Sequence, residues 1–330
     1  MLQVRTHFVR DMRIWCVDHC ASNLRASARI NARPFIYVNT GQGGLRMIPA
    51  AFEYHRPSDI AGAISVLTEH GDDARVLAGG HSLIPMMKLR MADVPHLIDL
   101  QDIADLKGIT IEGSSITIGA MTTQHELIVD EALFAAAPII REAAHQIADP
   151  QVRYMGTIGG NVANGDPGND MPGLMQCLDA SFTLVGADGT RLVKARDFYE
   201  AAYMTERDDE EILTHITFAA TNSGFAYEKQ KRKIGDYATA ACAALVAKDG
   251  DKVSSASIAM TNLSDVPVLS ETAASALVGT SCDEVAVKAT VAAALKDIDP
   301  TEDNRGPVAF KMHVAGIIIS RAIARAWSRA

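Results

Sequence analysis

The sequence predicts an α+β fold with more than one domain, and three observations lead to this prediction. With 330 residues, the chain is long enough for two or three domains that each have a core. Between Phe52 and Phe218, short apolar segments of strand and helix type alternate. In the last third, three strand-like segments come first and three helical segments follow, which is typical of a separate α+β layer.

Composition and charge exclude several classes of protein. Apolar residues make up 48% and charged residues 22%, and no uncharged apolar run is long enough to predict a transmembrane segment. The net charge is −9, yet residues 1–46 contain seven Arg, no Lys and only two Asp. The remaining 24 basic and 38 acidic side chains make nucleic acid an unexpected partner for residues 47–330.

Residues 1–46 differ in composition from everything that follows. Their Arg-rich, Lys-free sequence has no sustained periodicity and no signal-peptide core, so we expect a disordered or non-native leader and a true start at Met47. Cys16, His19 and Cys20 would be three metal ligands without a fourth. The five cysteines include no C-x-x-C pair, so we expect neither a metal site nor an iron–sulfur cluster in this chain.

The elements from residue 47 to residue 148 follow from apolar periodicity and capping residues. We expect a helix that Ser58 caps and that ends before Gly71, a hairpin across Gly113-Ser114-Ser115, a short helix starting at Thr122–Gln124, and a helix over 138–148. The other expected strands are Phe52–His55, Ala74–Ala78 and Leu97–Leu100.

A first glycine stretch, Ala78-Gly79-Gly80-His81-Ser82, lies between a predicted strand and a helix over Leu83–Met91. Ser82 is a good N-cap residue for that helix. A strand, a glycine pair and a helix start offer unpaired N–H groups to a phosphate.

A second glycine stretch, Arg153–Gly165, holds four glycines, two asparagines and a threonine. Glycine permits positive φ and close approach of a ligand, and successive N–H groups in such a loop form an anion-binding concavity. Together the two stretches predict a diphosphate-bearing, nucleotide-like cofactor that is held from two sides, although either stretch alone is also compatible with a structural turn.

The second half continues with a helix over 171–178, a hairpin across Asp188-Gly189 and a strand over 212–218. A domain boundary is expected at Asn222–Gly224. After it we expect strands at 225–229, 238–247 and 253–260 and helices at 270–278, 283–297 and 308–329.

Five motifs in this order resemble a known family. They are Met47-Ile48-Pro49, Phe52-x-Tyr54-x-x-Pro57, Ala78–Ser82, Arg153–Asn161 and Lys231-Arg232-Lys233-Ile234-Gly235-Asp236-Tyr237-Ala238. Together they resemble the FAD-binding medium subunit of molybdenum hydroxylases, most closely that of aerobic carbon monoxide dehydrogenases, over residues 47–330.

The resemblance implies a fold and a domain division. Residues 47–223 are expected to form an FAD-binding domain of the vanillyl-alcohol-oxidase (PCMH) type, with subdomains at about 47–102 and 103–223. Residues 224–330 are expected to form a smaller C-terminal α+β flavoprotein domain.

The resemblance also implies FAD-binding residues. The diphosphate would lie between Ala78–Ser82 and Thr157–Asn161, Asp170 would bind ribose hydroxyls, and Tyr237 would contact the isoalloxazine ring. The full set is Ala78, Gly79, Gly80, His81, Ser82, Thr122, Thr157, Ile158, Gly159, Gly160, Asn161, Asp170, Leu213, Lys229 and Tyr237. No catalytic acid, base or metal ligand is expected.

Each single residue of this set also has a structural alternative. His81 would satisfy a turn, Asp170 would be a favourable anion in a first helical turn, and Tyr237 would be a core aromatic residue. Leu213 would belong to the core, Thr122 and Thr123 would be caps, and the basic run 229–233 would be a solvated surface.

By the same resemblance, the chain is an electron-transfer subunit of a cytoplasmic enzyme complex, peripheral at the inner face of the membrane. It would take electrons from an iron–sulfur small subunit next to a molybdopterin large subunit and pass them to an acceptor such as a quinone. The alternatives are a free-standing FAD-dependent oxidoreductase of this fold, a scaffold that has lost its flavin, and a relative that oxidises purines or aromatic acids.

Overall fold

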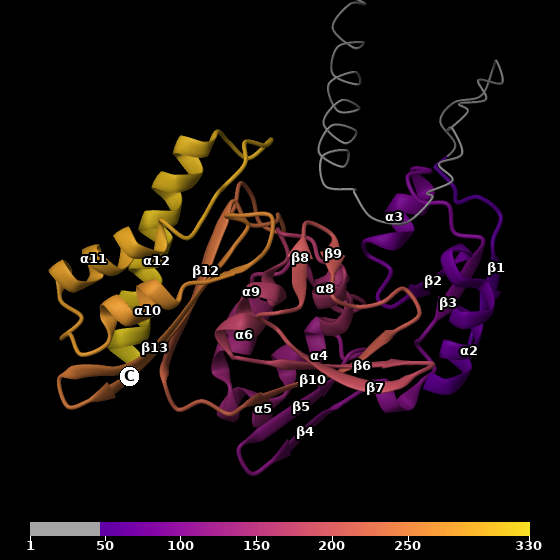
Figure 1. The fold of residues 1–330 in the computed structure, drawn as a ribbon, viewed down its shortest axis with the longest axis horizontal. Coiled ribbons are helices and arrows are strands. Elements are labelled where there is room, and N and C mark those ends of the chain that lie inside the picture. Colours follow the sequence, from indigo (N-terminus) through magenta and orange to yellow (C-terminus); the bar gives the residue numbers. More distant parts are fainter. Residues whose placement is uncertain (1–46) are drawn as a thin grey trace, which may run out of the picture. The chain divides into compact units, whose positions relative to one another are not determined.

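The computed structural model describes residues 47–330, which form one compact unit (Figure 1). The expected leader, residues 1–46, lies outside the described residues. The strands are β1 (Glu53–His55), β2 (Ala74–Leu77), β3 (His96–Asp99), β4 (Ile109–Glu112), β5 (Ser115–Gly119), β6 (Ser181–Gly186), β7 (Gly189–Lys194), β8 (Tyr199–Ala201), β9 (Met204–Thr205), β10 (Ile212–Ala219), β11 (Gly224–Gln230), β12 (Ala240–Asp249), β13 (Lys252–Thr261) and β14 (Val268–Leu269). The helices are α2 (Ile60–His70), α3 (Leu83–Lys88), α4 (Gln124–Val129), α5 (Glu131–Ala136), α6 (Pro138–Ala144), α7 (Pro150–Arg153), α8 (Ile158–Ala163), α9 (Asp170–Cys177), α10 (Glu271–Leu277), α11 (Glu284–Ala294) and α12 (Val308–Arg329).

The first sheet is parallel and small, with the strand order β1-β3-β2. The buried side of α2, including Ile64 and Leu67, packs in one cluster with Ile98 of the central strand. Asp59 rather than the predicted Ser58 caps α2, because its carboxylate accepts a hydrogen bond from the Gly62 amide at 2.7 Å. Gly71 ends the helix with a positive φ of 50°, as predicted.

The second sheet is antiparallel, with the strand order β4-β5-β10-β6-β7. Both predicted hairpins are confirmed, and Gly113 in the first turn has a φ of 61°. Helices α4, α6, α8 and α9 contribute buried side chains to the same core as the sheet, among them Ile140, Ile158 and Leu174. This core therefore fixes the position of α8, which belongs to the second glycine stretch.

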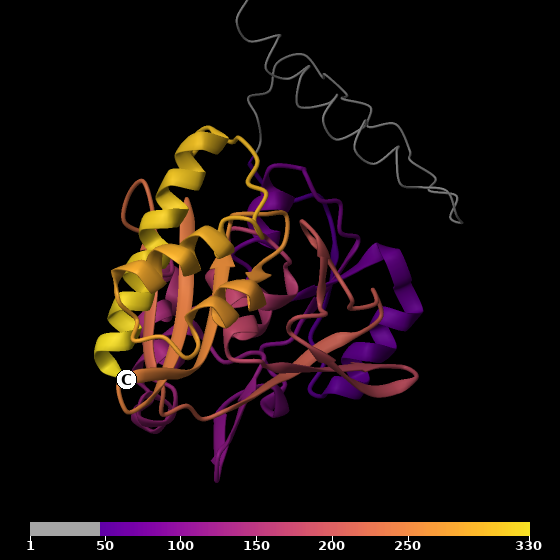
Figure 2. The same ribbon diagram turned by 60° about the vertical axis from the view of Figure 1, so that its left-hand side comes forward.

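The third sheet, β11-β12-β13-β14, is antiparallel. Figures 1 and 2 show α12 lying against this sheet and covering one of its faces. The face under the helix is made of small residues such as Ala240 and Ala244, so Ala315 and Ala322 of α12 lie close to the strands. The helix has the predicted bounds, 308–329. The strands-then-helices order of the last third is confirmed.

Some short elements were not predicted. The second glycine stretch is not one continuous loop, because it contains the end of α7 and all of α8. Helix α5 and the strands β8, β9 and β14 have two to six residues each, too few for a clear period. Among residues 47–330, none of the helices combines the length and the apolar character needed to cross a membrane.

Candidate functional site

A cavity of about 480 Å³ is bordered by elements of the first, second and third sheets. This volume is within the range of small-molecule and cofactor sites. Most of the residues that the sequence assigned to a cofactor line it: Ala78, Gly79, Gly80, His81, Ser82, Thr157, Gly159, Gly160, Asn161, Asp170, Leu213, Lys229 and Tyr237. Thr122 and Ile158 do not line it, since Ile158 is in the core and the Thr122 hydroxyl bonds to the backbone of Gly108.

The two glycine stretches touch each other at one side of this cavity. A Cβ atom on Gly79 would collide with the carbonyl oxygen of Met155 and the Cα atom of Gly156. A Cβ atom on Gly160 would lie 3.4 Å from the Cβ atom of Ala78. The glycines therefore allow the two backbones to lie directly against one another.

The first glycine stretch has unused backbone donors. Within residues 47–330, no acceptor is recorded for the N–H groups of Gly79, Gly80, His81 and Ser82. Gly80 has a φ of 72°, which favours glycine, and the His81 Nδ1 atom donates to the Gly79 carbonyl at 2.8 Å. Ser82 precedes α3 but makes no side-chain capping bond. These N–H groups are free to bind an anion.

The N–H groups of Ile158–Asn161, in the second glycine stretch, are already bonded within the protein. Ile158 donates to Thr122 O at 2.9 Å and Gly159 donates to Ala120 O at 2.8 Å. Gly160 donates to the Thr157 hydroxyl at 3.0 Å, and Asn161 donates to the Thr157 carbonyl at 3.1 Å. Thr157 is thus the N-cap of α8. The expected row of free donors is therefore not available here.

The reason for glycine at position 159 also differs from the expectation. A Cβ atom there would lie 2.5 Å from the Ala120 Cβ atom and 2.7 Å from the Ala120 oxygen. Gly159 is therefore required by packing of the protein against itself. Three donors of the second glycine stretch are still available to a ligand: the Thr157 N–H group, which has no acceptor among residues 47–330, the Thr157 hydroxyl proton and the side-chain amide of Asn161. The Asn161 Oδ1 atom already accepts from Met171 N at 3.1 Å.

Asp170, at the start of α9, belongs to a buried polar group. Its Oδ2 atom lies 2.7 Å from Lys229 Nζ, and its Oδ1 atom accepts a hydrogen bond from the Tyr227 hydroxyl at 2.5 Å. The two charged side chains are only 5% and 1% exposed. Burial and the carboxylate raise the pKa of Tyr227, which keeps it a donor. The carboxylate retains lone pairs for a ligand hydroxyl.

Tyr237 and Leu213 border the cavity in different ways. Tyr237 is 42% exposed, and the Arg305 guanidinium lies 5.6 Å from its ring centroid. Partial burial raises the pKa of Tyr237, so the ring stays neutral. Leu213 is 5% exposed and lies beside a bulge of β10, where the register with β6 shifts.

Two lining residues were missed by the sequence reasoning. Gln124 is buried, and neither its Oε1 nor its Nε2 atom has a partner among residues 47–330. A buried unpaired amide is costly, so it points to a ligand that completes it. Arg207 is largely buried, burial lowers its pKa, and it donates to the Glu211 carbonyl at 2.9 Å. Apolar periodicity carries no signal for either role.

The residues of this cavity fit FAD. Four free N–H groups suit a diphosphate, a buried carboxylate suits ribose hydroxyls, and a half-exposed tyrosine suits a flat ring system. The unpaired Gln124 amide is the observation that most clearly calls for a polar ligand.

Comparisons with known proteins agree with this fit. Residues 50–219 match the family described as the FAD binding domain in molybdopterin dehydrogenase, and residues 225–326 match the CO dehydrogenase flavoprotein C-terminal domain. The carbon monoxide dehydrogenase medium chain of Afipia carboxidovorans is 54% identical over 86% of this chain and 99% of that one.

A less similar relative and a solved structure also match nearly the same part of the chain. The glyceraldehyde dehydrogenase medium chain of Sulfolobus acidocaldarius is 31% identical over 84% of this chain and 98% of its own length. The structure of reconstituted CO dehydrogenase from Oligotropha carboxidovorans contains a chain with a TM-score of 0.85 and 54% identity, covering 86% of this chain and all of that one. These findings confirm the predicted family, the flavoprotein fold and FAD as the cofactor. The chain therefore belongs to the FAD-binding medium chains of the molybdopterin dehydrogenase family.

Proposed function

We propose that the chain is the electron-transfer subunit of a carbon monoxide dehydrogenase. The observation that carries this proposal is the difference in similarity between relatives: 54% identity to a carbon monoxide dehydrogenase medium chain against 31% to a glyceraldehyde dehydrogenase medium chain. Both relatives are covered almost completely, so the difference does not arise from partial alignment.

Within the proposed subunit, this chain's residues bind and orient FAD. The N–H groups of the first glycine stretch and the Thr157 hydroxyl bind the diphosphate, and Asp170, held by Lys229 and Tyr227, binds ribose hydroxyls. Gln124 would donate to and accept from FAD, and Tyr237, at the border of the cavity, would contact the ring system. When bound, a flavin supplies the ability to accept electrons singly and release them in pairs.

The proposal includes partners and a place in the cell. An iron–sulfur subunit delivers electrons, a molybdopterin subunit oxidises the substrate, and a quinone accepts the electrons at the inner face of the cytoplasmic membrane. Residues 47–223 form the FAD-binding domain, with subdomains at about 47–102 and 103–223, and residues 224–330 form the C-terminal domain.

The experiment that tests the function compares the assembled complex with the isolated chain, both loaded with FAD. Carbon monoxide should bleach the flavin absorbance of the complex but not that of the isolated chain, and a soluble quinone should restore it. Bleaching of the isolated chain by a small substrate would support the free-standing oxidoreductase instead. Bleaching of the complex by a purine or an aromatic acid, but not by carbon monoxide, would assign the chain to a different branch of the family.

A further inference from the structure

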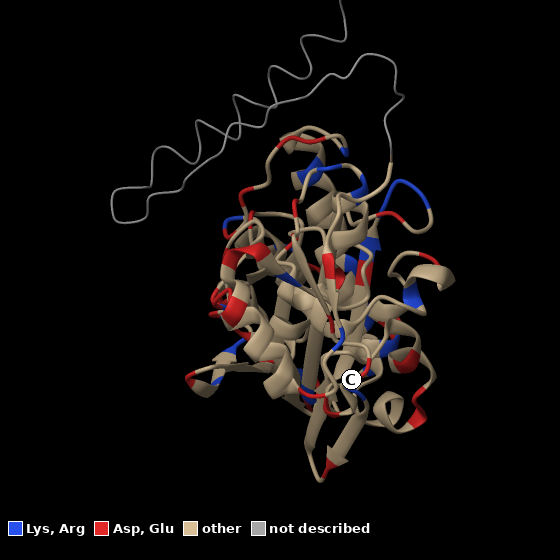
Figure 3. Cartoon of the chain, turned by 90° about the vertical axis from the view of Figure 1, so that its right-hand side faces the viewer, with Lys and Arg blue, Asp and Glu red and all other residues tan. Residues whose placement is uncertain are grey.

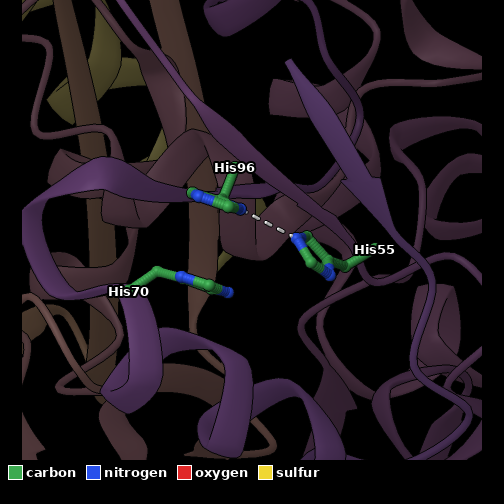
Figure 4. Close-up of side chains that lie close together, drawn as sticks. All are labelled: His55, His70 and His96. Carbon is green, nitrogen blue, oxygen red and sulfur yellow. Dashed lines mark hydrogen bonds between the residues drawn. The ribbon is translucent and has the colours of Figure 1, made fainter.

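Three histidines from separate elements meet on one face of the first sheet. His55 belongs to β1, His70 is the last residue of α2, and His96 begins β3 (Figure 4). His55 Nε2 lies 3.1 Å from His96 Nδ1, and the rings of His70 and His96 are stacked with centroids 3.7 Å apart. One nitrogen of each ring lies within 4.8 Å of the others.

The backbone explains why these rings converge. In the parallel register, Glu53 pairs with His96 and His55 pairs with Ile98. Because alternate residues of a strand share a face, Glu53, His55 and His96 lie on the same side of the sheet. Helix α2 packs on that side through Leu67, and its end at His70 brings the third ring to the other two.

The polar environment of this cluster consists mainly of its own members. In the described part of the chain, the recorded polar partners of the His55 and His96 ring nitrogens are each other and Glu53, whose Oε2 atom lies 3.7 Å from His96 Nδ1. All three histidines are half-buried, and none of them lines the FAD cavity. The FAD site therefore does not account for the cluster.

We propose that His55, His70 and His96, with Glu53 as the fourth ligand, bind one divalent transition-metal cation of the Zn²⁺ type. Imidazole nitrogen is a preferred ligand of such cations, and carboxylate oxygen completes tetrahedral sites. Zn–N bonds of about 2.0–2.1 Å place ligand nitrogens about 3.3 Å apart around a tetrahedral ion. His55 and His96 already have about that spacing, while His70, whose ring is stacked on that of His96, has to turn its ring toward the ion.

The ion would connect two strands of the first sheet to the end of α2. From there the chain runs through Gly71–Asp73 into β2, and β2 leads directly to the first glycine stretch. The cation would therefore hold in place the element that presents the free N–H groups to FAD. Sequence inspection missed the site because its ligands lie 15 and 26 residues apart, without a recurring ligand spacing.

The test is calorimetric titration of Zn²⁺ into the full-length, FAD-loaded chain after treatment with a chelator. The test variant is His70→Gln, and the matched control is His313→Gln, an exposed histidine of α12. The parent and the control should bind one more equivalent of Zn²⁺ than His70→Gln, or bind it at least tenfold more tightly. Cys16, His19 and Cys20 also offer ligands for Zn²⁺. The test therefore uses the difference in Zn²⁺ binding between the variants and not the absolute number of equivalents bound.

Thermal unfolding gives a second readout. Zn²⁺ should raise the melting temperature of the parent and of His313→Gln, but not that of His70→Gln, while Mg²⁺ raises none of them. If His70→Gln loses its flavin, His55→Gln takes its place with the same expectation. Equal Zn²⁺ binding and equal stabilisation in the parent and the cluster variant would overturn the proposal and leave a metal-free stack of imidazoles.

Discussion

The two glycine stretches look alike in sequence but differ in the hydrogen bonding of their backbone N–H groups. The N–H groups of Gly79, Gly80, His81 and Ser82 have no recorded acceptor among residues 47–330. Those of Ile158–Asn161 are all bonded to the protein itself. The comparison teaches that a glycine-rich sequence does not by itself indicate free donors: the hydrogen-bond partners of its backbone decide.

The difference follows from what surrounds each stretch. The second is held by Ala120 and Thr122 just after β5, and Thr123 and Thr157 form an isolated antiparallel bridge. The first leaves the edge strand β2 and runs into the short helix α3. We infer that the second stretch is the support and the first is the binding element. Figure 3 shows acidic and basic residues interspersed along the described chain.

The largest expected effect is that of Gly159→Val. The added side chain has no space beside Ala120, so the free energy of unfolding should fall by about 3 kcal/mol or more. Thermal unfolding of the FAD-free protein measures it. If the FAD-free variant has an unchanged melting temperature but no longer binds flavin, Gly159 serves the ligand. The proposed difference between the two glycine stretches would then be wrong.

Ser82→Pro should instead act on the ligand. Proline removes the free N–H group, and a lost hydrogen bond to a charged group costs about 1.5–3 kcal/mol, or roughly ten- to a hundredfold in FAD affinity. The matched control is Ser82→Ala, which keeps the N–H group and should bind FAD almost normally, because the hydroxyl makes no capping bond. Equal affinity of the two variants for FAD, measured by flavin fluorescence titration, would contradict the role of this donor.

Gln124→Met separates stability from binding. Methionine removes a buried amide that has no partner in the described residues, so the FAD-free protein should become more stable by about 1 kcal/mol. FAD affinity should fall about tenfold, since the ligand loses its partner. Opposite shifts of melting temperature and affinity are the expected signature. An unchanged affinity would show that Gln124 does not contact the cofactor.

The turn before Tyr237 also borders the cavity, and it serves as a reference for the two glycine stretches. Asp236 accepts hydrogen bonds from Arg232 Nε and Tyr237 N, both at 2.9 Å, and chiefly the bond from Arg232 lowers its pKa below the ordinary 3.8. A lowered folded-state pKa stabilises the protein above the unfolded value, and this stability is lost as pH falls through the folded value.

Asp236→Asn should therefore cost less than about 1 kcal/mol at pH values above about 5, and the difference from the parent should shrink as the pH falls below 3.8. Melting temperatures of both proteins across this range measure the effect. A difference that grows toward low pH would reverse the sign and exclude the ion pair as its source.

Much of this fold could be predicted from the sequence. Long apolar segments with one clear period, such as 308–329 and 253–260, correspond to α12 and β13. The turn residues Asp188-Gly189 correctly predicted the hairpin of β6 and β7. The cap of α2 was placed one residue early, because Ser58 and Asp59 are both good caps and only the geometry selects between them.

The candidate site could be predicted only in part. Motifs located the lining glycines, Asp170 and Tyr237, but not which N–H groups remain free, because this depends on Ala120 and Thr122 in another element. Gln124 and Arg207 carry no motif. The signal of Gln124 is a buried amide without a partner among residues 47–330, that of Arg207 is a partly buried charge, and burial is a property of the folded chain.

Amide hydrogen exchange with and without FAD tests the central claim most directly. The N–H groups of residues 79–82 should exchange fast in the FAD-free protein and slow strongly when FAD is added, because they have no acceptor in the described chain. Those of residues 158–161 should already exchange slowly and change little. FAD-dependent protection confined to 158–161, with none at 79–82, would contradict the assignment of support and binding element.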